Sequence, residues 1–211
     1  MLKAIVTSGA TIERIDPVRY ITNDSSGKQG HAIAQALQEN GVNVTLISGK
    51  VNIPPPENVN VISVESAEEM LTSVENSLPA DIFVSAAAVC DWKPEQKHSQ
   101  KMKKTSDKNY LDIRFVKTPD ILKTISNHKM RPKIVVGFAA ETENLLENAK
   151  TKLINKGCDY ILANDVSKGV FGSETNTVSL VSKCNIETWD KMSKKDVADK
   201  LSKIILSSIN L

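Results

Sequence analysis

The chain has 211 residues, of which 40% are hydrophobic and 25% are charged, and its formal net charge is +2. This composition is typical of a globular chain with a hydrophobic core, so we expect one domain over residues 1–211. The small net charge disfavours a dedicated nucleic-acid-binding protein, and no apolar run is long enough to cross a bilayer. Met1 lies almost directly before the first predicted strand, which predicts no signal peptide and a cytoplasmic location.

Strands alternate with helices along the chain. Apolar runs predict strands at residues 4–7, 42–48, 59–64, 81–89, 111–116, 134–139, 160–163 and 178–181. Helical periodicity and capping residues predict helices at 30–40, after Ser66, after Thr118 (with Pro119 in the first turn), at 145–156 and from Ser193 to 209. This alternation predicts a Rossmann-like three-layer α/β domain with a mainly parallel sheet.

Residues 16–30 form a stretch rich in Gly, Ser and Asn between the first predicted strand and the first predicted helix. Glycine lets backbone amides approach a ligand closely, and the start of a helix favours negative charge. The stretch matches neither a P-loop nor a three-glycine Rossmann fingerprint. A plain connecting loop is the alternative, but we favour a site for a phosphate-bearing ligand.

Ligands of parallel α/β sheets bind beyond the carboxyl ends of the strands. That rule places Gly9 and the segments 87–91, 138–141 and 164–165 on one edge of the predicted sheet. Residues 90–108 are polar and rich in lysine, and we expect a mobile lid loop there. The scattered cysteines and histidines match no disulfide framework or zinc site, so we expect buried thiols and no histidine-based metal site, and we assign no residue as a metal ligand.

Six motifs occur in a fixed order. They read Asp-Pro-Val-Arg at 16–19, Asn-Asp-Ser-Ser-Gly at 23–27, Ala-Ala-Ala-Val-Cys-Asp-Trp at 86–92, Lys-Met-Lys-Lys at 101–104, Gly-Phe-Ala-Ala-Glu-Thr at 137–142 and Ala-Asn-Asp-Val at 163–166. Together they closely resemble phosphopantothenoylcysteine synthetase, the phosphopantothenate–cysteine ligase of coenzyme A biosynthesis. Cys90 and Trp92 depart from the Ala and Tyr that are usual in this family.

The resemblance implies an acyl-cytidylate intermediate, made from 4′-phosphopantothenate and CTP with Mg²⁺ and release of pyrophosphate. L-Cysteine then displaces CMP. Bacterial members use CTP and animal members ATP, and this chain is more similar to the bacterial type. The resemblance also implies a homodimer, and either a stand-alone enzyme or a piece of a fusion whose decarboxylase would act as a separate partner.

The resemblance assigns catalytic roles to Asn23 and to Lys101, which would close over the triphosphate. The residues that it implies for nucleotide binding are Gly9, Ser25, Gly27, Gly30, Ala86, Ala87, Asp91, Lys101, Pro119, Asp120, Ile121, Leu122, Phe138, Lys152, Lys156 and Asn164. Phosphopantothenate would be held by Asn23, Ala87, Ala88 and Asp91, with Arg19 delivered by a neighbouring subunit.

Two other classes of protein remain as alternatives. An NAD(P)-dependent oxidoreductase would carry an acidic residue after the second strand, where Ser48-Gly49-Lys50 stands, and none of the three tyrosines has a lysine four residues later. A non-catalytic nucleotide-binding protein could share the same fold.

Overall fold

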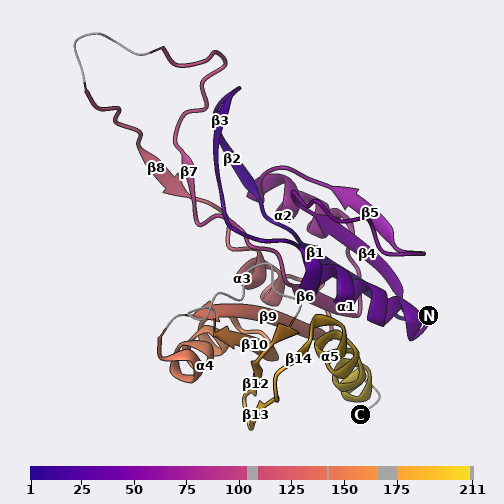
Figure 1. Cartoon of the computed structure of the whole chain (residues 1–211). Helices are drawn as coiled ribbons and strands as arrows, with labels where there is room; N and C mark the ends of the chain where they lie inside the picture. The colour runs from indigo at the N-terminus through magenta and orange to yellow at the C-terminus, as the bar shows by residue number, and fades with distance from the viewer. Residues whose placement is uncertain (104–108, 142, 166–174, 210–211) are drawn as a thin grey trace.

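The computed structural model describes residues 1–103, 109–141, 143–165 and 175–209 (Figure 1). Within them, an eight-stranded sheet has the order β13-β12-β10-β9-β6-β1-β4-β5. Its parallel strands are β1 (Lys3–Ser8), β4 (Asn43–Ser48), β5 (Asn60–Ser63), β6 (Ile82–Ser85), β9 (Ile134–Glu141) and β10 (Tyr160–Asp165). β12 (Val178–Ser182) is antiparallel to β10, and β13 (Ile186–Thr188) is antiparallel to β12. The mainly parallel sheet predicted from the sequence is confirmed.

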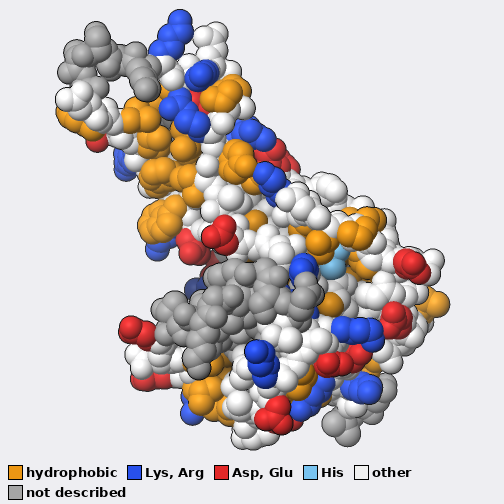
Figure 2. Space-filling model, in the orientation of Figure 1, with side chains coloured by type: hydrophobic (Ala, Val, Ile, Leu, Met, Phe, Trp, Pro, Cys, Tyr) orange, Lys and Arg blue, Asp and Glu red, His pale blue; other side chains and the backbone are white. Residues whose placement is uncertain are grey.

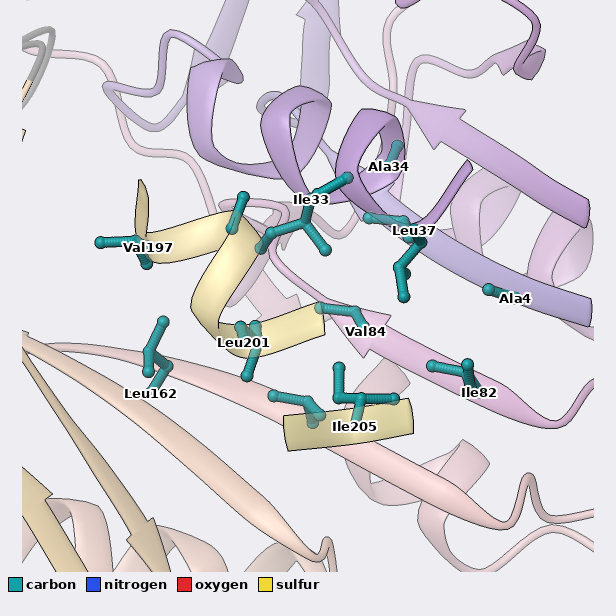
Figure 3. Close-up of a cluster of buried hydrophobic side chains, with 14 of the residues drawn as sticks. Ala4, Ile33, Ala34, Leu37, Ile82, Val84, Leu162, Val197, Leu201 and Ile205 are labelled. Atoms are coloured by element: carbon teal, nitrogen blue, oxygen red, sulfur yellow. The ribbon is translucent and has the colours of Figure 1, made fainter. Parts of the chain in front are cut away.

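Helices cover both faces of this sheet. α1 (Lys28–Glu39) and α5 (Lys194–Ile209) pack on one face, where Ile33, Leu37 and Leu201 meet the strands in a buried cluster (Figure 3). α2 (Ala67–Asn76), α3 (Ile121–Ser126) and α4 (Leu145–Lys156) contribute to a second cluster on the other face. The predicted three-layer α/β architecture is therefore confirmed. None of the helices in the described ranges is long and apolar enough to cross a membrane.

Two short hairpins form an arm that projects from the sheet (Figure 1). One pairs β2 (Ile12–Asp16) with β3 (Arg19–Thr22), and the other pairs β7 (Trp92–Pro94) with β8 (Phe115–Lys117). β2 and β7 lie side by side. The arm exposes the large hydrophobic residues Val18, Tyr20, Trp92, Tyr110, Leu111 and Phe115, and Figure 2 shows hydrophobic side chains gathered on it. A further pair, β11 (Thr175–Asn176) with β14 (Met192–Ser193), lies beside α5.

Several predicted boundaries were wrong. The stretch 16–30 is not one loop, because its first part forms β3 and the turn before it. The strand predicted at 81–89 ends at Ser85, and the strand predicted at 111–116 is reduced to β8 in the arm. The segment 90–108 contains β7, and its residues 104–108 lie outside the described ranges.

The third helix begins later than expected. Its N-cap is Asp120, whose carboxylate accepts a hydrogen bond from the Lys123 amide at 3.0 Å. The Thr118 hydroxyl donates instead to the Cys90 carbonyl. The predicted caps Ser66 and Ser193 are confirmed, since each hydroxyl accepts from the amide three residues later, that of Glu69 and that of Asp196.

Candidate functional site

Two adjoining cavities lie at the carboxyl edge of the parallel strands. The first, which we call the loop cavity, has a volume of about 580 Å³ and is lined by residues 23–30, 86–89, 91, 138–140, 152, 164 and 194. The second, the helix cavity, has a volume of about 460 Å³ and is lined by residues 85, 87, 89, 91, 92, 117–122, 138, 152 and 156. Ala87, Val89, Asp91, Phe138 and Lys152 line both, so the two cavities adjoin along a shared wall and make up one site.

This space brings together most of the residues predicted from the sequence. Asn23, Ser25, Gly27, Gly30, Ala86, Ala87, Ala88, Asp91, Phe138, Lys152 and Asn164 line the loop cavity. Pro119, Asp120, Ile121, Leu122 and Lys156 line the helix cavity. Among the described residues that line the two cavities, Gly9, Arg19 and Lys101 do not appear. The roles of all these residues remain predictions.

The loop cavity is built around the start of α1. Gly27 is the N-cap in a left-handed conformation with φ +73° and makes no side-chain capping hydrogen bond. The first backbone hydrogen bond of the helix runs from the His31 amide to the Gly27 carbonyl at 3.0 Å. The Lys28 amide donates to Ser26 Oγ at 3.4 Å, and the amides of Gln29 and Gly30 have no carbonyl acceptor one turn earlier within the helix. Such a helix start can bind an anion through its amides and its dipole.

Close packing explains why two of these residues are glycines. A Cβ at Gly27 would lie 2.4 Å from Val51 Cγ1, and a Cβ at Gly30 would lie 2.4 Å from Ser8 Oγ. Gly9 has φ +74°, and a Cβ there would lie 3.0 Å from the Gly49 carbonyl. Gly9 thus serves the packing of one loop on another at the edge of the loop cavity.

The loop after β6 forms the floor of the loop cavity, and backbone hydrogen bonds join it to the loops after β1 and β4. The Ala88 amide donates to the Gly9 carbonyl at 2.8 Å, and the Thr11 amide donates to the Ala88 carbonyl at 3.2 Å. The Lys50 amide donates to the Ala10 carbonyl at 2.8 Å. The chain segments that follow β1, β4 and β6 are therefore connected, and the last of them lines the loop cavity.

Asn23 is attached to this floor by its side chain. Its Nδ2 donates to the Val89 carbonyl at 3.0 Å, which holds the amide group at the cavity although the residue is exposed. Asp91, also exposed, lies at the junction of the two cavities. An amide and a carboxylate thus both line the loop cavity.

Lysines supply positive charge to the cavities. Lys152 and Lys156, one helical turn apart on α4, both line the helix cavity, as their spacing predicted. Lys156 Nζ forms an ion pair with Asp120 Oδ2 at 2.5 Å. Asp120 therefore has two roles, because its other carboxylate oxygen caps α3. Lys28 and Lys194 add two further cationic residues to the loop cavity. A highly charged anion would meet several cations here.

Arg19 and Lys101 lie together on the arm. The buried carboxylate of Asp16 accepts from Arg19 Nε and Nη2 at 3.0 and 2.5 Å and from the Met102 amide at 3.1 Å. Arg19 Nη2 also donates to the Met102 carbonyl at 2.9 Å. The Arg19 guanidinium holds the pKa of Asp16 well below its usual range, with the bonds from the Val18, Met102 and Arg19 amides as further causes. Lys101, the neighbour of Met102, is exposed.

Two side-chain oxygens of residues that line the loop cavity are buried without a hydrogen-bond donor. Within the described part of the chain, Gln29 Oε1 and Asn164 Oδ1 are buried and have no hydrogen-bond partner. Gln29 Nε2 donates to the Lys194 carbonyl at 3.0 Å. Because an unpaired buried acceptor is costly, these two oxygens suit a ligand that carries N–H or O–H groups.

Sequence reasoning assigned no role to several residues that line the cavities, among them Asp24, Lys28, Gln29, Trp92, Lys117 and Lys194. Lys28 and Gln29 follow the glycine of the second motif directly, and that position was a usable signal. Lys194 is brought to the site only by the packing of α5 beside α1, which no local pattern reveals.

The cysteines do not contribute a reactive thiol to the cavities. Cys90 and Cys158 are buried, whereas Cys184 is exposed at the turn between β12 and β13. Burial raises the pKa of the Cys90 thiol and raises that of Cys158 to about 11. The predicted burial is confirmed for two of the three thiols and wrong for Cys184.

Comparisons with known proteins agree with the motifs. The chain is 44% identical over 207 residues to the coenzyme A biosynthesis bifunctional protein CoaBC of Haemophilus influenzae, which covers 97% of this chain and 51% of that protein. It is 40% identical over 212 residues to the protein of the same name from Escherichia coli K12, with 99% and 51% covered. The chain thus spans about half the length of the curated relatives it matches.

A solved structure supports the same assignment. The crystal structure of the C-terminal domain of a coenzyme A biosynthesis bifunctional protein CoaBC superposes with a TM-score of 0.82 at 34% identity, covering 100% of this chain and 97% of that one. The family model described as DNA/pantothenate metabolism flavoprotein C-terminal domain matches residues 1–209. The chain therefore belongs to the DNA/pantothenate metabolism flavoprotein C-terminal domain family, which confirms the family resemblance drawn from its six motifs.

Proposed function

We propose that the chain catalyses the joining of 4′-phosphopantothenate to L-cysteine in coenzyme A biosynthesis, with CTP as the activating nucleotide. The observation that carries the proposal is the pair of adjoining cavities at which the start of α1, the segment 86–91 and Lys152 meet. Membership of a family whose curated relatives are named for coenzyme A biosynthesis supports the same reaction. The proposal includes an acyl-cytidylate intermediate, because a carboxylate does not react with an amine until its oxygen belongs to a good leaving group.

The two cavities suggest where each substrate binds. The triphosphate would lie in the loop cavity against the α1 amides, with Ser25 and Lys28 nearby. The nucleoside would extend into the helix cavity beside Phe138 and residues 119–122. Phosphopantothenate would place its carboxylate near Asn23 and Asp91, where the cavities join.

In the first step, a carboxylate oxygen of phosphopantothenate attacks the α-phosphorus of CTP. A P–O bond forms, the bond to the β-phosphate breaks, and pyrophosphate leaves. In the second step, the amine of cysteine attacks the acyl carbon, the C–O bond to CMP breaks, and the amine loses a proton. The Asn23 amide, held by its bond to Val89, can donate to the developing oxyanion.

Mg²⁺ fits this site as a companion of the nucleotide. The described residues contain no group of three His, Cys, Asp or Glu side chains that would hold a metal ion. Two carboxylates, Asp24 and Asp91, do line the loop cavity. Mg²⁺ commonly binds through substrate phosphates plus one or two carboxylates, and it would supply charge neutralisation. Asp24 and Asp91 are the residues that would hold it here.

We also propose that two copies share each site through the arm. Six large hydrophobic residues are exposed there, and such a surface suits association with a second copy. The Arg19 side chain is 43% exposed on the arm and does not line its own chain's cavities, which supports delivery to a neighbour. Its planar fork suits the phosphate of phosphopantothenate.

The activity is tested by pyrophosphate release from CTP, 4′-phosphopantothenate and cysteine. We expect release that requires phosphopantothenate, and faster turnover with CTP than with ATP at equal concentration and saturating Mg²⁺. Equal rates with both nucleotides would defeat the CTP assignment alone. No release with either nucleotide would favour a non-catalytic nucleotide-binding protein, and hydride transfer from NAD(P)H would favour the oxidoreductase.

The shared site is tested by mixing two inactive variants, Arg19→Ala and Asn23→Ala. Random pairing makes about half of the dimers mixed, each with one intact site, so the mixture should regain roughly a quarter of wild-type activity. Because Arg19 also binds Asp16 and Met102, the melting temperature of Arg19→Ala serves as a control for the integrity of the arm. An inactive mixture, with subunit exchange verified, would place Arg19 in its own chain's site.

A further inference from the structure

A buried polar cluster lies behind the anion-binding loop, outside the residues assigned to the reaction. Ser8, the last residue of β1, donates from Oγ to the Gly27 carbonyl at 2.9 Å. His31 Nδ1 lies 3.1 Å from the same carbonyl and 3.0 Å from Ser8 Oγ. The His31 amide also donates to this carbonyl, as the first bond of α1. Two side chains and one amide thus converge on a single backbone oxygen.

The position of that oxygen matters for anion binding. A peptide carbonyl carries partial negative charge and would repel a phosphate if it faced the loop cavity. Gly27 has a left-handed backbone conformation. Because glycine adopts left-handed and right-handed conformations about equally readily, its own backbone preference does not hold the carbonyl in place. The Ser8 hydroxyl and the His31 ring therefore add to the bond from the His31 amide in holding the carbonyl in place, and their contacts draw it toward the end of β1.

We propose that Ser8 and His31 are positioning residues for the anion-binding loop, holding the Gly27 carbonyl toward β1 so that the α1 amides remain directed at the ligand. This inference rests on the proposed use of the loop cavity for the triphosphate. Both side chains are buried, Ser8 fully and His31 with 7% exposure, so the contact is maintained without competition from solvent.

The geometry also specifies the tautomer of His31. Ser8 Oγ donates its proton to Gly27, so it can only accept from Nδ1, and the Gly27 carbonyl likewise only accepts. Nδ1 must therefore carry a proton. Burial lowers the pKa of His31, which keeps the ring neutral at neutral pH. Nε2 is then unprotonated, and His31 borders a separate cavity of about 590 Å³ that also contacts Ser48 and Lys50.

The tautomer is measured by ¹⁵N NMR of the imidazole nitrogens in the full-length chain without ligand. We expect the neutral ring with the proton on Nδ1, whereas free histidine favours Nε2. A neutral ring protonated on Nε2 would overturn the proposal, since Nδ1 could not then donate to Gly27. This measurement does not depend on what the protein catalyses.

Variants then test the effect on binding. His31→Phe keeps a ring of similar size without a donor, and His31→Asn places an amide N–H near the position of Nδ1. We expect His31→Phe and Ser8→Ala each to weaken binding of CTP with Mg²⁺ by about tenfold in calorimetry, as loss of one buried hydrogen bond would. His31→Asn should recover most of the affinity. For both weakened variants, the KM for CTP should rise with little change in kcat.

Ser48→Ala is the matched control. Ser48 pairs with Ser8 in the neighbouring strand and is equally buried, but its hydroxyl donates to Gly49 at 3.0 Å. Unchanged affinity in His31→Phe and Ser8→Ala, with wild-type binding intact, would overturn the positioning role alone. A wild-type chain that binds neither CTP nor inorganic pyrophosphate would overturn the proposed function as well. If Ser48→Ala weakened CTP binding as much as Ser8→Ala does, the effect of Ser8 would be one of general packing and not of positioning.

Discussion

Replacing Gly30 by alanine would insert a methyl group into the contact between α1 and the end of β1. The new Cβ would lie 2.4 Å from Ser8 Oγ, 2.6 Å from Ser8 Cβ and 3.1 Å from Ser8 Cα. The last of these is a backbone atom, so rotation of the serine side chain cannot relieve the whole overlap. Overpacking of this kind costs about 1–3 kcal/mol, whereas alanine favours a helix over glycine by about 1 kcal/mol.

Overpacking therefore outweighs helix propensity, and we expect a net loss of about 1 kcal/mol with a fall in melting temperature of about 2–4 °C for a chain of this size. Removing the Ser8 side chain should relieve the overlap, so Ser8→Gly with Gly30→Ala should lose less stability than the sum of the two single variants. Gly41→Ala is the control, because a Cβ there meets nothing within 4 Å and its strain comes from φ +80° alone. The stability loss of Gly41→Ala should simply add to that of Ser8→Gly, with no coupling between the two sites. Additive losses for the Gly30 pair would refute the proposed contact.

Three further substitutions test the site and the arm. Lys101→Gln should slow pyrophosphate formation by about 100-fold, because the proposed role of Lys101 is to place a cation at the triphosphate. The melting temperature should stay nearly unchanged, because Lys101 is exposed. Activity within a few-fold of wild type would mean that Lys101 is only a surface residue. Asn23→Asp should still form acyl-cytidylate, detected by mass analysis after quenching, but pass it poorly to cysteine; loss of both half-reactions together would indicate a simple binding role. Asp16→Asn should lower the melting temperature at neutral pH, because the depressed pKa of Asp16 means that its ionised form stabilises the fold. That stabilisation is complete above the pKa of about 4 for an unfolded aspartate and is lost progressively as the pH falls toward the much lower folded pKa, so the difference from wild type should shrink below about pH 4. A difference that stayed constant between about pH 5 and pH 2 would contradict the assignment.

The central sheet could be predicted because its strands are buried on both faces. β1, β4, β9 and β10 read as apolar runs, and the helices between them are capped or ended by local signals such as Ser66 and Gly157. Once the strands are parallel, their carboxyl ends must meet at one edge. That rule alone placed the segments 87–91 and 138–140 near the α1 loop, and the cavities confirm that they lie together.

The arm could not be predicted because its charged residues are buried by partners far away in the sequence. Glu13 in β2 is 5% exposed, and its carboxylate accepts from the Ala67 amide at the start of α2. Burial raises the pKa of Glu13, although that bond from Ala67 opposes the shift. Asp16 is likewise buried, and beside its local partner Arg19 it accepts from the amide of Met102, which lies 86 residues away. A local sequence pattern indicates an exposed loop at such residues, because the distant groups that bury them are not part of it.

The same limit explains the error at the third helix. Thr118 and Asp120 are both suitable caps, and the sequence favoured the first because Pro119 follows it. The Thr118 hydroxyl instead donates to the Cys90 carbonyl, and the Thr118 amide donates to the Asp91 carbonyl at 3.0 Å. Those bonds attach the segment to the site floor, so the helix begins at the next available carboxylate.

The hydrogen bonds between the loops after β1, β4 and β6 have a consequence for the cost of binding. Amides in connecting loops usually exchange with solvent quickly, yet those of Lys50 and Ala88 are paired as in a strand and should be protected from exchange without any ligand. The floor of the loop cavity at residues 86–89 is then held in place when the sheet folds. Ordering a loop on binding costs about 1–2 kcal/mol per residue in backbone entropy, and this floor has already lost that freedom. More of the interaction energy with the substrates therefore remains available for aligning the reacting groups.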